Sequence, residues 1–174
     1  MSSDKKLFNL ILSAMFLAIA IVLPFLTGQI PQIGKALCPM HIPVLLCGFF
    51  CGPWYAIAVG LTAPLLRFSL FGAPVLIPTG IAMCFELAGY GFASGFLYKH
   101  LPRKKSNVYA ALAGAMIFGR LAWAAARVVL YGLGKSPFGW AAFFSGAFIN
   151  AVPGIIVQIV LIPLLVMTLE KRKY

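Results

Sequence analysis

Long apolar segments fill most of this chain and constrain its fold more than any other feature. A helix that crosses a bilayer needs about 20 mostly apolar residues. Six segments are candidates, two of them barely, and the predicted helices are 7–26, 41–51, 54–71, 78–98, 109–131 and 143–169. The second is too short to span comfortably, and Gly52-Pro53 separates it from the third with almost no loop. We expect an all-α membrane protein, a bundle of six transmembrane helices forming one domain over residues 1–174.

The composition excludes a soluble domain and, with it, nucleic-acid binding. A net charge of +11 would suggest nucleic acid for a soluble chain. Here 62% of the residues are hydrophobic and only 10% are charged, and most lysines and arginines flank apolar segments. We therefore expect membrane lipid, and no nucleic acid, around this chain. The first apolar segment is too long for a signal peptide and lacks a convincing cleavage site, so we interpret it as a retained helix.

The flanking charges predict the orientation in the membrane. Basic clusters lie before the first helix (Lys5, Lys6), after the fourth (103–105) and after the sixth (171–173). Cytoplasmic loops carry the excess of Lys and Arg, so the three clusters should lie on one side. That requires an even number of helices between them, which six helices satisfy. Both termini are therefore expected in the cytoplasm.

Four charged side chains interrupt the predicted spans: Arg67, Glu86, Arg120 and Arg127. At the centre of a membrane helix each costs about 2.5–3.5 kcal/mol on insertion-based scales. Together they would offset the net stability of a whole domain. These side chains must therefore face protein or water and be paired.

Counting from the cytoplasmic ends places these charges in the outer half of the bundle, with Arg120 closest to the midplane. Two further polar residues of the predicted helices, His41 and Asn150, belong to the same half. Gln29 and Gln32, in the loop before the helix that starts at His41, also lie on that side. The inner half is comparatively dry. This distribution favours a pocket closed at its inner end over a channel through both halves.

Arg120, Trp123 and Arg127 are spaced i, i+3 and i+7, which places them on one face of a helix. A flat or anionic solute would stack on the indole and pair with a guanidinium, whose fork fits carboxylate and phosphate. The alternatives are that Arg127 extends to the outer headgroups and that Arg120 is a structural partner of Glu86. Three arginines against one carboxylate leave a positive surplus, which favours an anionic solute.

The remaining polar residues allow two interpretations each. His41 either contacts the solute or is a helix-end histidine in contact with water. Asn150 either contacts the solute or forms an interhelical hydrogen bond, and Gln158 is interpreted as packing. The cysteines form no CxxC or zinc pattern, so no metal and no cofactor are expected. Small residues four apart are predicted to let helices pack closely: Gly48 with Gly52, Gly91 with Gly95, Ala14 with Ala18.

These features resemble the substrate-binding S components of energy-coupling factor (ECF) transporters, small six-helix proteins that capture vitamins for bacteria and archaea. The resemblance covers nearly the whole chain: the basic N-terminus, Ser13-Ala14-Met15-Phe16-Leu17-Ala18, residues 41–53 (HIPVLLCGFFCGP) and the basic loop before the fifth helix. It implies a solute site toward the outside, in a multi-pass protein of the prokaryotic plasma membrane. It also implies that Ala14 and Ala18 dock a transmembrane coupling subunit that works with two ATPase subunits. Several vitamin-type members have an acidic residue where this chain has His41.

We therefore expect a solute-capture subunit that is not an enzyme. The chain has no GxxxxGK[ST] motif, so ATP hydrolysis must come from partner subunits. An intramembrane enzyme would need two carboxylates, a metal set or a Ser/His pair, and this chain offers Glu86 with His41 at a helix end. A self-sufficient carrier or channel is the other alternative. The expected solute is a small anionic or zwitterionic vitamin or precursor, such as pantothenate, a folate, a B6 vitamer or a flavin.

Overall fold

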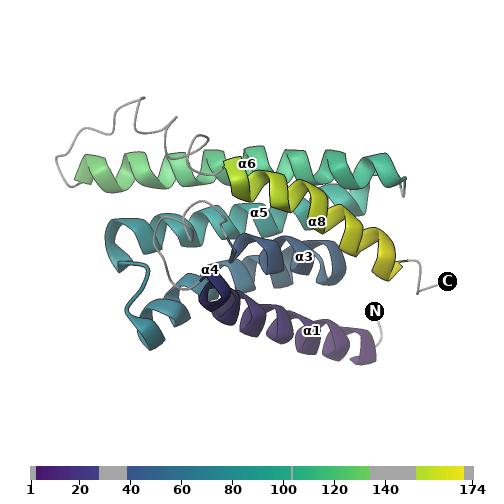
Figure 1. The fold of residues 1–174 in the computed structure, drawn as a ribbon, viewed down its shortest axis with the longest axis horizontal. Coiled ribbons are helices and arrows are strands. Elements are labelled where there is room, and N and C mark those ends of the chain that lie inside the picture. The colour runs from purple at the N-terminus through teal and green to yellow at the C-terminus, as the bar shows by residue number, and fades with distance from the viewer. Residues whose placement is uncertain (1–2, 28–38, 103, 134–151, 171–174) are drawn as a thin grey trace.

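The computed structural model describes residues 3–27, 39–102, 104–133 and 152–170, and this part of the chain is helical without strands. Six α-helices and two short helical turns make it up (Figure 1). In chain order they are α1 (Ser3–Val22), η1 (Leu23–Thr27), α3 (His41–Cys51), α4 (Pro53–Phe71), η2 (Leu76–Gly80), α5 (Ile81–His100), α6 (Lys105–Leu133) and α8 (Val152–Glu170).

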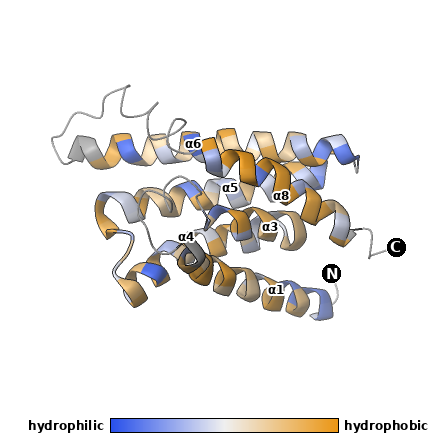
Figure 2. Ribbon diagram, in the orientation of Figure 1, coloured by the Kyte–Doolittle hydropathy of each residue, from blue (hydrophilic) through white to orange (hydrophobic). Residues whose placement is uncertain are grey.

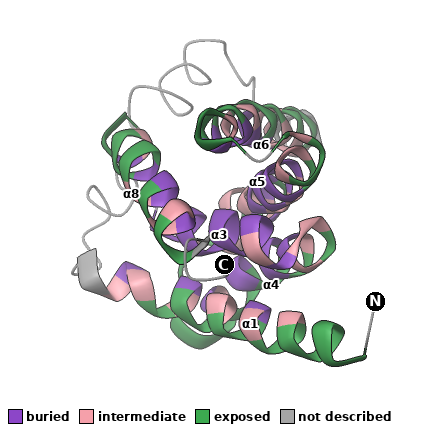
Figure 3. Cartoon of the chain, turned by 90° about the vertical axis from the view of Figure 1, so that its right-hand side faces the viewer, coloured by how far each residue is buried: buried purple, intermediate pink, exposed green. Residues whose placement is uncertain are grey.

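Five of these helices, α1, α4, α5, α6 and α8, are long and apolar enough to cross a membrane. The sixth, α3, has 11 residues and is therefore about 16 Å long. The all-α class and the short second helix are thus confirmed. Many large apolar residues remain exposed on these helices. Much of the ribbon in Figure 2 is coloured hydrophobic, and the outward sides of the helices in Figure 3 are coloured exposed. Such faces suit lipid rather than water.

Several helix ends differ from the sequence-based expectation. The first helix begins at Ser3 rather than at residue 7, and α6 begins at Lys105 rather than at residue 109. Hydropathy marks where lipid contact starts, whereas polar residues can continue the helix into the headgroup region. The fourth predicted helix begins at Ile81, because a kinked turn occupies Leu76–Gly80. The predicted start of the sixth helix, at residue 143, lies outside the described residues.

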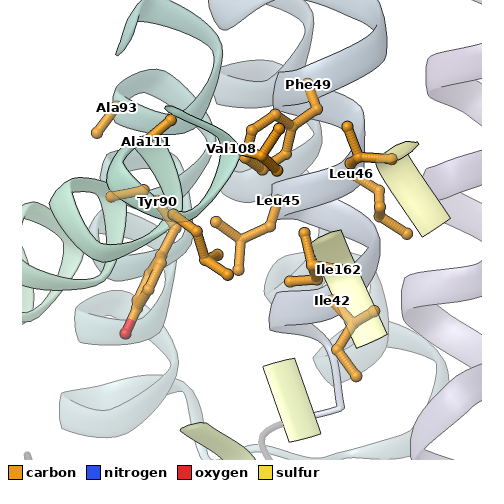
Figure 4. Packing of buried hydrophobic residues seen from close by; sticks show 12 residues of the cluster. Ile42, Leu45, Leu46, Phe49, Tyr90, Ala93, Val108, Ala111 and Ile162 are labelled. Carbon is orange, nitrogen blue, oxygen red and sulfur yellow. The ribbon is translucent and has the colours of Figure 1, made fainter. Parts of the chain in front are cut away.

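The short helix α3 lies at the centre of the bundle. All of its residues except Phe50 are buried, and it contacts α1, α4, α5 and α8 (Figure 3). One apolar cluster joins α3 to α5, α6 and α8 through residues such as Leu45, Tyr90, Val108 and Ile162 (Figure 4). A second cluster packs α3 against α1, α4 and α5. Because α3 is surrounded by protein, it need not span the bilayer.

The described lysines gather at one end of the bundle. Helices α1 and α6 begin at this end, and α5 and α8 end there (Figure 1). The Tyr55 hydroxyl donates to the Lys6 carbonyl oxygen (3.4 Å), so α4 also starts at this end and α3 must finish there. We call it the basic end, because Lys5, Lys6, Lys99, Lys104 and Lys105 belong to it.

Glycines allow α4 and α5 to pack backbone to backbone. A Cβ atom on Gly60 would lie 2.6 Å from the backbone of Leu87 and Ala88, and one on Gly91 would lie 2.8 Å from the Ala56 carbonyl oxygen. Close packing at the predicted Gly91 and Gly95 pair is thus confirmed. Gly52 differs, since a Cβ atom added to it would meet no other atom within 4 Å, and its φ of 95° instead supports the turn between α3 and α4.

We expect Gly60→Val to destabilise the protein in detergent, by about 1–3 kcal/mol, because the added methyl groups meet rigid backbone of α5. Thermal unfolding followed by circular dichroism measures the effect. Ala58→Val is the matched control, because Ala58 is an exposed residue of the same helix. Equal melting temperatures for both variants would contradict the close-packing interpretation.

Candidate functional site

A buried carboxylate, Glu86 of α5, lies at the meeting point of three helices. Its side chain is 3% exposed, and its Oε1 accepts a hydrogen bond from Nη1 of Arg120 on α6 at 2.7 Å. The Nε2 atom of His41, the first residue of α3, lies 3.3 Å from the same oxygen. We call these three residues the Glu86 cluster.

Small residues bring the cluster together. A Cβ atom on Gly89 of α5 would lie 3.3 Å from the Gly119 Cα atom of α6, so these antiparallel helices approach closely beside Glu86. The Tyr90 ring packs directly over Gly119. His41 meets that ring edge-on, with ring centroids 5.0 Å apart. Tyr90 thus holds the imidazole in its orientation next to the carboxylate.

The Glu86 cluster decides two of the alternatives left open by the sequence. The pair of Arg120 with Glu86, which the sequence offered as an alternative to solute binding, is present. His41 is 3% exposed, so the interpretation of a histidine in contact with water is wrong. The sequence left both interpretations of His41 open, because it could not show that neighbouring helices extend past the start of α3.

Trp123 and Arg127 form a second group on α6, further from the basic end. Trp123 is 7% exposed and packs with Ala82 of α5. The Arg127 guanidinium carbon lies 5.1 Å from the centre of the indole ring, in a cation–π arrangement. Trp123 and Arg127 therefore lie on one face of α6, as the spacing predicted, and the Arg127 guanidinium lies over the indole ring.

Arg67 lies elsewhere, between α4 and α1. Its Nη1 donates to the Ile21 carbonyl oxygen at 3.1 Å, and its guanidinium carbon lies 5.4 Å from the Phe25 ring centre. It therefore binds the end of α1, where helix carbonyls have no partner in the helix itself. The described contacts do not bring Arg67 to the Glu86 cluster. Asn150, like Gln29 and Gln32, lies outside the described residues.

The predicted docking residues Ala14 and Ala18 are exposed on α1. Exposed apolar side chains surround them on the same helix, including Leu10, Ile11 and Met15. This outward face therefore combines small residues with a lipid-compatible rim, as a helix-packing surface in a membrane requires.

Gln158 of α8 is a buried polar residue that the sequence reasoning assigned to packing. It is 2% exposed, and its Oε1 has no hydrogen-bond partner within the described part of the chain. The signal in the sequence was an amide within an otherwise apolar helix. Across the described segments, no three His, Cys, Asp or Glu side chains are grouped as a metal site would require.

Comparison with known proteins assigns the family. No curated protein and no solved structure shows significant similarity to the chain. The family described as "ECF transporter, substrate-specific component" matches residues 8–166. Proteins of this family are multi-pass membrane subunits that bind the small molecule to be taken up and act with an ECF module; they are not enzymes. The chain therefore belongs to the substrate-specific components of ECF transporters.

Proposed function

We propose that this chain captures a small, water-soluble vitamin or precursor in the outer half of the bundle, at the Glu86 cluster and the neighbouring Trp123 and Arg127. The observation that carries this proposal is the buried Glu86 cluster itself. Ionised groups inside membrane proteins are costly and generally mark solute or ion sites. The cluster is the place where α3, α5 and α6 bring such groups together.

The depth of the cluster supports a site that opens outward. Glu86 is the sixth residue of α5, about 8 Å along the helix from its start at Ile81, which is the end remote from the lysines. Trp123 and Arg127 lie further still in that direction. Toward the basic end the same space is filled by Leu45, Leu112 and other apolar residues. With the basic end in the cytoplasm, as the positive-inside rule favours, the site faces outside.

The charges support an anionic or zwitterionic solute. Glu86 has an arginine and a histidine within ion-pair distance, and Arg127 adds a further cation beside a flat ring. A solute carboxylate or phosphate would accept hydrogen bonds from these guanidinium groups. Pantothenate, a folate, the phosphate of a B6 vitamer and a flavin phosphate combine such an anion with polar or flat parts. Arg67 and Asn150 remain predicted contacts.

Release of the solute into the cytoplasm would require partner subunits. We propose that Ala14 and Ala18 dock a transmembrane coupling subunit of the prokaryotic plasma membrane, and that two ATPase subunits supply the energy. The exposure of both alanines on an apolar face of α1 supports this docking.

Native mass spectrometry of the purified chain tests capture. We expect one small molecule per chain, because a buried site of this kind retains its solute through extraction. Cells that express the chain should take up that solute only with the coupling and ATPase subunits. Uptake that persists without them would instead establish a self-sufficient carrier.

Affinity for the same solute tests the role of the arginines. We expect Arg127→Ala to weaken binding at least tenfold, about 1.4 kcal/mol, through loss of a charge-assisted contact. Arg120→Ala should do the same, and it is combined with Glu86→Gln so that no unpaired carboxylate stays buried. Lys99→Ala, at the basic end of α5, is the control. Unchanged affinity in both arginine variants would remove the argument for an anion.

Docking is tested by substitutions that leave the site intact. Ala14→Leu and Ala18→Leu should lower uptake severalfold without changing the affinity for solute, because bulky side chains prevent close helix approach. Ala113→Leu, at an exposed position of α6, is the matched control. If Ala113→Leu lowers uptake as much as the α1 variants do, the assignment of α1 is wrong.

A further inference from the structure

Gln158 lies on the one face of α8 that points into the protein. Gly154, Gln158, Ile162 and Val166, four residues apart, are buried, whereas Ile156, Ile159 and Val160 are exposed. Its amide is thus withdrawn from lipid and water together. Its Oε1 has no hydrogen-bond partner among the described residues. The interpretation of Gln158 as a packing residue therefore leaves the hydrogen-bonding capacity of its amide oxygen unused.

The helix register places Gln158 toward the start of α3. Ile162 and Val166 share an apolar cluster with Ile42 and Leu45, and Ile162 lies beside Ile42 in Figure 4. Helices α3 and α8 run in the same direction, because both finish at the basic end. Gln158 is one turn before Ile162, about 6 Å further from the basic end. This is the direction in which His41 precedes Ile42.

His41 contributes a second buried polar atom without a partner. Its Nε2 lies 3.3 Å from Glu86 Oε1, and neither ring nitrogen has a hydrogen-bond partner among the described residues. The tautomer that carries its proton on Nε2, toward the carboxylate, has Nδ1 as an acceptor. The start of α3 and the facing turn of α8 therefore present two buried acceptors.

Unsatisfied buried acceptors are rare in native proteins and point to a missing donor. If Gln158 served only to pack α8, an apolar side chain of similar size would give the same or a higher stability, because the helix around it is apolar. Two such atoms on contacting helices, one of them in a residue beside Glu86, indicate a bound molecule that brings N–H or O–H groups.

We propose that Gln158 Oε1 and His41 Nδ1 form a hydrogen-bonding subsite for the solute, and that they select a molecule with N–H or O–H donors in addition to its anionic group. This inference rests on the proposed capture function. It narrows the solute to a bifunctional molecule: the arginines bind its anion, and Gln158 with His41 accept from an amide, amino or hydroxyl group.

The test uses the full chain in detergent and Gln158→Met, which keeps the side-chain length and removes the amide. The probes are pantothenate, pyridoxal 5′-phosphate, folate and riboflavin 5′-phosphate, each an anion with donors, together with any solute that co-purifies. Affinity is measured by calorimetry, and the thermal stability of the solute-free protein is measured in parallel. Thr168→Val, which removes an exposed hydroxyl from the same helix, is the control.

We expect Gln158→Met to weaken binding at least tenfold while the solute-free protein melts at the same or a higher temperature. This combination separates recognition from packing, because loss of a structural hydrogen bond would lower the melting temperature. Affinity within twofold of the original, or reduced stability of the solute-free variant, overturns the subsite and leaves the capture function standing. If the original chain binds none of the probes and carries no solute, the capture function fails and the subsite fails with it.

Discussion

The need to pair buried charge inside a lipid-embedded bundle governs the arrangement of this protein. Lipid offers no hydrogen bonds, so each ionised side chain that enters the bundle must find its partner on another helix. Glu86 meets this requirement with Arg120 at 2.7 Å and His41 at 3.3 Å. The cluster joins α3, α5 and α6 at one depth, and the small residues Gly89 and Gly119 allow α5 and α6 to approach there.

The same constraint accounts for the short helix α3. A helix of 11 residues cannot cross the bilayer, yet it is buried along nearly its whole length. Because α1, α4, α5 and α8 surround it, its ends need not reach the headgroups, and its first residue can lie within the bundle. Both ring nitrogens of His41 therefore lie inside the protein, and Nε2 has the Glu86 carboxylate as a neighbour. A full-length helix would have placed the same residue at the surface.

The sequence predicted the features that follow from local pattern. Apolar length predicted the helices, and spacing placed Arg120, Trp123 and Arg127 on one face. Single charges in apolar helices predicted that these side chains are paired, and the pair of Arg120 with Glu86 was one of the alternatives that they allowed. The sequence could not predict features that depend on how far one helix is shifted along its axis relative to its neighbours. These are the burial of His41, the binding of Arg67 to the end of α1, and the Gln158 amide oxygen that has no hydrogen-bond partner among the described residues. No local pattern reports which turn of one helix faces which turn of another.

This pairing also bears on how an anionic solute would enter the site. A solute carboxylate and Glu86 would compete for the guanidinium of Arg120, and a carboxylate that lost its only partner would remain buried at high cost. His41 Nε2 lies 3.3 Å from the same oxygen, close enough to donate to Glu86 if Arg120 turned part of its fork to a solute. On the proposed function, a carboxylate with two nearby partners would tolerate such an exchange better than a simple ion pair. The position of His41, rather than the number of arginines, is then what would permit reversible capture.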